Sequence, residues 1–114
     1  MTDCIFCKII NKEIKSDIVY EDEDVLAFND IDPKAPQHIL VIPKKHVACL
    51  SDLGRPELPL IAKVYGVIQK LVEDKKLKAA GYRVVVNEGK SAGQAVFHVH
   101  FHLLGGRDFS WPPG

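Results

Sequence analysis

Three histidines occupy alternate positions in the segment Phe97-His98-Val99-His100-Phe101-His102-Leu103. Side chains of a β-strand point to opposite faces in turn, so this spacing puts the three imidazoles on one face and the apolar residues on the other. Such a row has three interpretations: a polar surface strand, a set of metal ligands, or a catalytic site. In a catalytic site, a neutral imidazole attacks phosphorus or a carbonyl group while its neighbours orient it and bind the developing anion.

The loop before this segment, from Asn87 to Gln94, favours phosphorus as the reacting centre. Gly93 permits a close approach of the backbone to a ligand, and exposed N–H groups could hold a phosphate. The triplet Gly89-Lys90-Ser91 resembles part of a P-loop, but Val84 stands where that motif needs its first glycine, and a strand is predicted where a helix is required. A P-loop is therefore excluded, and a plain hairpin connection remains the alternative to a phosphate cradle.

The elements that must position these residues follow from the hydrophobic periodicity. Alternating or β-branched apolar residues predict five strands, at 18–21, 25–29, 38–42, 82–87 and 95–104. Apolar residues at three- and four-residue steps predict one long amphipathic helix from about Pro56 to Leu77 and a short helix over residues 5–10. The order of strands, helix and strands predicts an α+β domain with an antiparallel sheet.

Composition and charge are those of an ordinary globular protein. A length of 114 residues suits one compact domain, which we predict to span 1–114. Fifteen basic residues offset fifteen acidic ones, so no net field would gather nucleic acid or an anionic membrane. No segment approaches the roughly 20 apolar residues that cross a bilayer, and we expect a cytoplasmic location because no secretory signal is visible. Three cysteines then indicate thiols or metal ligands rather than a disulfide framework.

The string from His98 to Leu104 fits the signature His-φ-His-φ-His-φ-φ, in which φ is hydrophobic, and the chain resembles the histidine triad (HIT) family. It is similar in particular to the Hint branch, the histidine triad nucleotide-binding proteins. The segments that carry this similarity are Phe6-x-x-Ile9, Ala27 to Ile31, Ala35-Pro36-x-His38, Val41 to His46 and Trp111 to Gly114. The resemblance covers nearly the whole chain. It implies a HIT-like fold, a homodimer with two active sites, and catalysis that requires no cofactor.

The resemblance also implies a reaction, the hydrolysis of the P–N bond between a purine nucleoside monophosphate, adenosine in particular, and an amine. In the family pattern His100 is the nucleophile that forms a nucleotidyl-histidine intermediate, and the carbonyl of His98 holds its protonated ring nitrogen. His102 resembles a phosphate contact, and His38 resembles a supporting histidine that contacts the triad. Further implied contacts are Asn87, Gly93, Gln94, Ala95 and Val96 for the phosphate, Asp30 for the ribose, and Ile5, Phe6, Ile9, Phe28 and Ile31 for the base.

Ala95 departs from the family pattern, which has a serine two residues after the glycine that corresponds to Gly93. The serine hydroxyl is thought to assist the leaving group, whereas the backbone amide at this position is retained. We therefore expect activity to remain, with a slower first step or a different preference for the leaving group.

Cys4 and Cys7 form a C-x-x-C pair near the start of the chain. Such a pair is weak evidence for a metal site by itself, and two inert cysteines on a short helix remain the alternative. Similar members of the family complete a tetrahedral zinc site with two histidines, which correspond here to His46 and His98. The resemblance thus implies a structural zinc. Cys49 has no assigned ligand role, and we expect it to be a small core residue.

Two other functions remain open. A neighbouring HIT branch hydrolyses dinucleoside polyphosphates, although Gly105-Gly106-Arg107 and the Trp-Pro-Pro-Gly segment favour the Hint branch. Alternatively, the chain is a nucleotide-binding or partner-binding protein with weak catalysis, in which Ala95 marks the decay of the activity.

Overall fold

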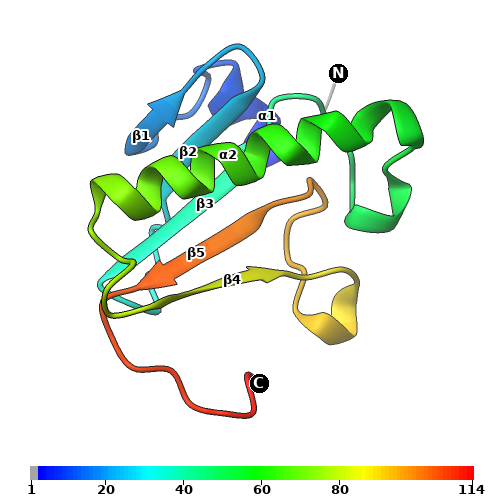
Figure 1. Cartoon of the computed structure of the whole chain (residues 1–114). Coiled ribbons are helices and arrows are strands. Elements are labelled where there is room, and N and C mark those ends of the chain that lie inside the picture. Colours follow the sequence, from blue (N-terminus) through cyan, green and yellow to red (C-terminus); the bar gives the residue numbers. More distant parts are fainter. Residues whose placement is uncertain (1–2) are drawn as a thin grey trace.

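The computed structural model describes residues 3–114, which form a five-stranded antiparallel sheet with a helix on each face (Figure 1). Met1 and Thr2, which belong to the predicted domain 1–114, lie outside the described residues. The strands are β1 (Ile18–Glu21), β2 (Val25–Asn29), β3 (Gln37–Pro43), β4 (Tyr82–Val86) and β5 (Phe101–Gly105), and the helices are α1 (Ile5–Ile10) and α2 (Leu58–Asp74). The order across the sheet is β1-β2-β3-β5-β4. The predicted α+β architecture, with one long helix and a short N-terminal helix, is confirmed.

Strands β2 and β3 divide the core into two apolar layers, one on each face of the sheet. The layer under α2 includes Val25, Ala27, Ile39, Val41, Phe101 and Leu103. The layer under α1 consists of Phe6, Ile9, Leu26, Phe28, Leu40 and Ile42. Full burial of an apolar side chain of this size contributes roughly 1.5–3 kcal/mol. Helix α1 depends on this packing because a helix of six residues is not stable alone.

Helix α2 is shorter at both ends than the periodicity predicted. Residues Arg55–Glu57 form a 3₁₀ turn before it, and Pro59 lies in its first turn, where a missing N–H costs least. Lys76 has a φ of 56°, which ends the helix before Leu77. The buried residues Val64, Val67, Ile68, Leu71 and Val72 lie on the face toward the sheet, as predicted. Within residues 3–114, no helix is both long and apolar enough to span a membrane.

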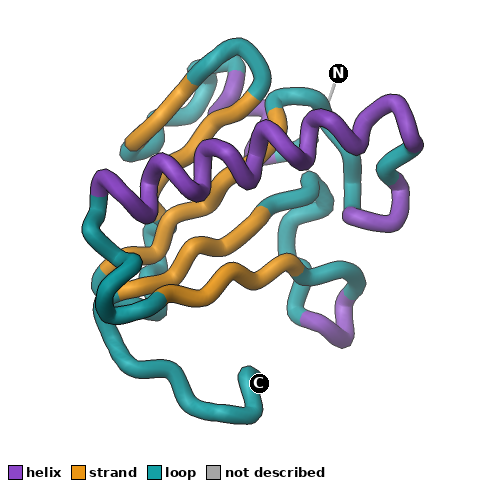
Figure 2. The backbone as a smooth tube through the Cα atoms, in the orientation of Figure 1, coloured by secondary structure: helices purple, strands orange, loops and turns teal. Residues whose placement is uncertain are grey.

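The prediction of a strand over 95–104 was wrong at its beginning, because β5 starts only at Phe101 (Figure 2). Its partner β3 ends at Pro43, which has no N–H to continue the ladder. The amide of Val99 instead donates to the carbonyl of Val47 at 2.7 Å. The predicted alternation nevertheless holds for the apolar face, since Val99 lies in the same buried layer as Phe101 and Leu103.

Candidate active site and metal centre

His100 is held in one tautomer by the backbone. Its Nδ1 lies 2.8 Å from the carbonyl oxygen of His98. A carbonyl oxygen only accepts hydrogen bonds, so Nδ1 carries the proton and Nε2 of the neutral ring keeps its lone pair. His100 as a whole residue is 7% exposed, and the edge-on ring of Phe6 from α1 lies 5.1 Å away between centroids. His100 therefore presents an unprotonated ring nitrogen from a fixed position.

His38 and His102 form a second fixed pair, at 2.9 Å between Nε2 of His38 and Nδ1 of His102. The amide of Lys34 donates to Nδ1 of His38 at 3.0 Å, which leaves the proton of the neutral ring on Nε2. Nε2 of His38 then donates to His102, and the proton of His102 must lie on its own Nε2. Burial lowers the pKa of His38 and, together with the neighbouring imidazoles, lowers the pKa of His102 to about 4, so both rings are neutral near pH 7.

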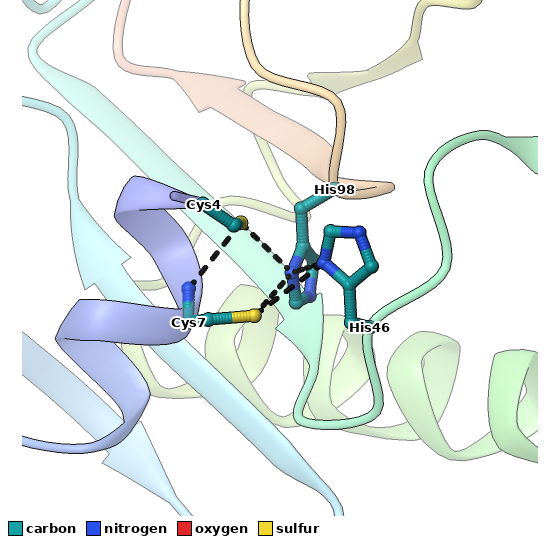
Figure 3. A group of neighbouring side chains, drawn as sticks. All are labelled: Cys4, Cys7, His46 and His98. Atoms are coloured by element: carbon teal, nitrogen blue, oxygen red, sulfur yellow. Dashed lines mark hydrogen bonds between the residues drawn. The ribbon is translucent and has the colours of Figure 1, made fainter. Parts of the chain in front are cut away.

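Cys4, Cys7, His46 and His98 converge on one point between α1, the segment after β3 and the segment before β5 (Figure 3). Their ligand atoms all lie within 4.8 Å of one another. Nδ1 of His98 lies 3.5 Å from Sγ of Cys4, 3.6 Å from Sγ of Cys7 and 3.2 Å from Nδ1 of His46. Sγ of Cys7 lies 3.4 Å from Nδ1 of His46.

These distances fit a tetrahedral zinc site. With Zn–N near 2.05 Å and Zn–S near 2.3 Å, the edges of such a tetrahedron are about 3.3 Å for N···N and about 3.6 Å for N···S. Nε2 of His98 donates to the carbonyl of Pro43 at 2.8 Å, which leaves Nδ1 as the ligand atom. Burial lowers the pKa of His98 and keeps its ring neutral, as a ligand must be. Two thiolates would balance the charge of Zn²⁺.

Comparisons with known proteins show the family of this chain. The sequence profile of the HIT domain matches residues 11–109. The chain belongs to the HIT domain family. It is 51% identical to the 14 kDa zinc-binding protein of Zea mays, over 96% of this chain and 87% of that protein.

Solved structures of HIT proteins have the same fold as this chain. One is a HIT family hydrolase from Legionella pneumophila Philadelphia 1, with a TM-score of 0.96 and 46% identity over 98% of this chain and all of that chain. Another is the histidine triad nucleotide-binding protein of Candida albicans, with a TM-score of 0.84 and 37% identity over 98% of this chain and 85% of that chain.

In this HIT domain, the five apolar residues expected around a base differ in burial. Phe6, Ile9 and Phe28 are buried in the layer between α1 and the sheet, where the rings of Phe6 and Phe28 meet edge to face at 5.5 Å. Ile5 at the start of α1 is 46% exposed, and Ile31 beyond β2 is 97% exposed. Ile5 and Ile31 therefore offer surface to a ligand, while the other three mainly pack the core.

A groove runs along the open part of the sheet face on which His102 lies. Its lining includes Asp30, His38, Asn87, His102, Arg107 and Phe109. The segment after β5 borders this groove: Arg83 of β4 donates to the carbonyl of Ser110, and the guanidinium of Arg107 lies 4.2 Å from the ring centroid of Phe109. Asp30 lies at the groove with Oδ2 3.4 Å from Nε2 of His38.

Asp30, His38 and His102 form a second group close enough to hold a metal ion, but their hydrogen bonds argue against it. Because Lys34 donates to Nδ1 of His38, the neutral ring has its proton on Nε2, the atom that would have to bind the metal. A ligand nitrogen must be unprotonated. This group fits a hydrogen-bond relay instead.

The loop between β4 and β5 brings Gly93, Gln94, Ala95 and Val96 next to the triad segment. Gly93 has a φ of 93°, a left-handed conformation that suits glycine. Ala95 is exposed, whereas Gln94 is 5% exposed and its side chain points into the protein. The groups of this loop that can contact a phosphate are therefore its backbone groups.

The sequence did not predict three groups that organise the site. They are the Lys34 amide, the Pro43 carbonyl and the Ala48 carbonyl, which contact His38, His98 and Gln94. All three are backbone atoms, so no residue type marks them in a sequence. The expectation that Cys49 is a small core residue was only partly right, because Cys49 is half-buried and lies beside Ser51.

Proposed function

We propose that the chain is a purine nucleoside phosphoramidate hydrolase of the Hint branch, acting on adenosine 5′-monophosphate linked to an amine. The observation that carries this proposal is the hydrogen bond from Nδ1 of His100 to the carbonyl of His98. It keeps the lone pair of Nε2 available for attack on phosphorus. The similarity to a HIT family hydrolase and to a histidine triad nucleotide-binding protein supports hydrolysis of a nucleotide substrate.

The proposed reaction has two steps. Nε2 of His100 attacks the phosphorus, the P–N bond to the amine breaks, and the leaving nitrogen keeps the electron pair and takes a proton from water. Ala95 has no hydroxyl that could supply this proton. Water then attacks the phosphorus, the bond to Nε2 breaks with its electrons returning to the imidazole, and the proton of the water passes to solvent. The products are the nucleoside monophosphate and the free amine.

Negative charge develops on the phosphoryl oxygens in both steps, and two kinds of donor are available for it. His102 carries its proton on Nε2, since His38 occupies its Nδ1. The loop amides after Gly93 supply main-chain N–H groups next to the triad segment. Donors fixed before the reaction stabilise the transition state without reorganisation. We assign the ribose to Asp30, whose carboxylate has acceptor sites beyond the one used by the Asp32 amide, and the base to the surface between Ile5 and Ile31.

We further propose a structural zinc held by Cys4, Cys7, His46 and His98. The support is the agreement of the donor distances with a tetrahedral site, together with the 51% identity to the zinc-binding protein of Zea mays. When bound, zinc would supply a cross-link between α1 and the triad segment and no reacting group. His100 does not belong to this set, and we propose that catalysis requires no cofactor.

A homodimer is also part of the proposal. Strand β4 lies at the edge of the sheet, and Tyr82 at its start is 44% exposed. Trp111 in the segment after β5 is 83% exposed, an unusual position for the largest apolar side chain. Sizing in solution tests the dimer, and a monomer at all concentrations would contradict it.

The function is tested with an adenosine phosphoramidate whose amine becomes fluorescent on release. We expect turnover by the natural protein and by Gln69→Ala, an exposed change on α2, and a loss of about 10³-fold or more in His100→Ala, which lacks the nucleophile. A dinucleoside polyphosphate offered in parallel tests the neighbouring branch. Absence of turnover with both, together with tight binding of adenosine monophosphate, would favour a nucleotide-binding protein instead.

A further inference from the structure

One buried side chain, Gln94, fastens the loop between β4 and β5. Its Oε1 accepts from the amide of Gly89 at 2.9 Å. Its Nε2 donates to the carbonyl of Ala48 at 2.8 Å and to the carbonyl of Val96 at 3.1 Å. Both N–H groups and the carbonyl oxygen of the carboxamide are thus used within the protein. Gln94 joins the start and the end of the loop and ties both to the segment after β3.

The residues that follow Gln94 differ from its side chain in their hydrogen bonding. Among residues 3–114, no hydrogen-bond acceptor pairs with the backbone amides of Ala95, Val96 or Phe97. Ala95 and Phe97 are exposed, so these amides lie near the surface. Backbone N–H groups without a partner in the protein can donate to an anion. The polar groups of the Gln94 side chain are therefore paired inside the protein, whereas the main-chain donors that follow it remain available to a ligand.

We propose that Gln94 is a positioning residue, which orients the amides of Ala95 to Phe97 toward the nucleotide phosphate without contacting the nucleotide. The inference rests on the proposed function and refines it. It assigns phosphate recognition to the main chain of the loop and the geometry of that main chain to the carboxamide. In the family resemblance Gln94 is a nucleotide contact, so the two assignments predict different behaviour of its side chain.

Neighbouring contacts explain why a glutamine is needed. A second attachment of the loop, from the amide and hydroxyl of Ser51 to the carboxylate of Glu88, is exposed to water, whereas the contacts of Gln94 are partly buried. Glutamate at position 94 would place its carboxylate against the carbonyl oxygens of Ala48 and Val96. Methionine would keep the length and volume but make none of the three hydrogen bonds. Each replacement removes the donors that hold the loop.

The test compares adenosine monophosphate with adenosine as calorimetric ligands of the full-length natural protein, Gln94→Met, Gln94→Glu and the control Gln69→Met. The two ligands differ only in the phosphate. We expect the affinity of Gln94→Met for adenosine monophosphate to fall about 10-fold or more, while its affinity for adenosine changes less than about twofold. Gln94→Glu should lose more, because its charge also repels the phosphate. Gln69→Met should bind both ligands like the natural protein.

Two results would overturn the role of Gln94. One is an unchanged ratio of the two affinities in Gln94→Met, and the other is an equal loss of both, which would mean a purely structural role. A natural protein that binds adenosine monophosphate no more tightly than adenosine would instead count against the proposed phosphate site.

A measurement on the natural protein does not depend on how the variants fold. In ¹H–¹⁵N spectra, adenosine monophosphate should shift the amide signals of Ala95 and Val96 and slow their exchange with solvent. The side-chain NH₂ of Gln94 should be protected from exchange both with and without the nucleotide. Protection of that NH₂ only in the presence of the nucleotide would mean that Gln94 is a direct contact.

Discussion

Two pairs of histidines in this protein have almost the same spacing and opposite chemistry. Ring nitrogens lie 3.2 Å apart between His46 and His98, and 2.9 Å apart between His38 and His102. In the first pair, a backbone carbonyl accepts from Nε2 of His98 and leaves an unprotonated nitrogen facing two cysteines. In the second, a backbone amide donates to Nδ1 of His38 and leaves a protonated nitrogen facing its neighbour. A single backbone hydrogen bond thus decides whether an imidazole nitrogen can bind a metal or can only donate a hydrogen bond.

Each of the two pairs has one member in contact with His100. His98 belongs to the proposed metal-ligand group, yet its carbonyl fixes the tautomer of His100. The ring of His102 lies 5.0 Å from the ring of His100 between centroids. His100, the proposed nucleophile, therefore lies between a group that fits a structural metal and a group that fits a hydrogen-bond relay. Substitutions in the two groups should have separate effects.

The largest expected effect is on metal content. Cys7→Ser should abolish zinc binding, since the site then has three strong ligands, and zinc at 100 times its Kd stabilises the natural protein by about 2.7 kcal/mol that the variant would lack. Elemental analysis and urea unfolding with and without zinc measure both quantities. Cys49→Ser is the matched control because Cys49 lies outside the ligand group. Natural protein without zinc after purification and zinc titration would contradict the proposed site.

The second effect is on turnover. His102→Ala removes a proposed phosphate donor and should lower kcat about 100-fold, while His38→Ala removes only the residue that fixes its tautomer and should lower kcat about 10-fold. Neither change should alter the zinc content, because neither residue belongs to the metal-ligand group. His38→Asn should recover part of the rate if an amide donates to Nδ1 of His102. Equal losses in His38→Ala and His102→Ala would mean that the two rings act as one unit.

The third effect is the dependence of stability on pH. Burial lowers the pKa of His102 to about 4 and also lowers that of His38, so the unfolded chain binds more protons below about pH 6.5. The free energy of unfolding should be fully developed above pH 6.5 and fall as the pH drops from 6.5 toward 4. Urea unfolding at several pH values measures this slope. In His102→Asn the slope should be shallower, and an unchanged slope would assign the effect to other groups.

The smallest expected effect concerns Ala95, which lies in the loop before the triad segment. Ala95→Ser adds a hydroxyl that could give a proton to the leaving amine, and we expect the first step to become about 10-fold faster at most. Pre-steady-state release of the fluorescent amine reports that step alone. The gain should be larger for an alkylamine than for a less basic arylamine, because less negative charge develops on the arylamine nitrogen as the P–N bond breaks, although both nitrogens take a proton. A slower step with both amines would mean that the added side chain obstructs the loop.

Much of the fold could be predicted because its signals are local. The alternation of Val99, Phe101 and Leu103 correctly assigned these residues to one buried face. The three- and four-residue steps of α2 likewise predicted its buried side. The beginning of β5 could not be predicted, because it depends on where Pro43 of β3 leaves the ladder, and that pairing joins segments more than 50 residues apart. Histidines and apolar residues still alternate through residues 98–100, although these residues are not part of strand β5.

By itself, the sequence determined which residue types are available: a triad of histidines, a C-x-x-C pair and a glycine-containing loop. Tertiary structure decided what each of them can do. The carbonyl of Pro43, the amide of Lys34 and the carbonyl of Ala48 set the state of His98, His38 and Gln94. Every residue except proline has the same main-chain donor and acceptor, so these partners leave no mark in the sequence. Only folding brings one particular backbone atom to one particular ring nitrogen, and that contact fixes the proton on which the chemistry depends.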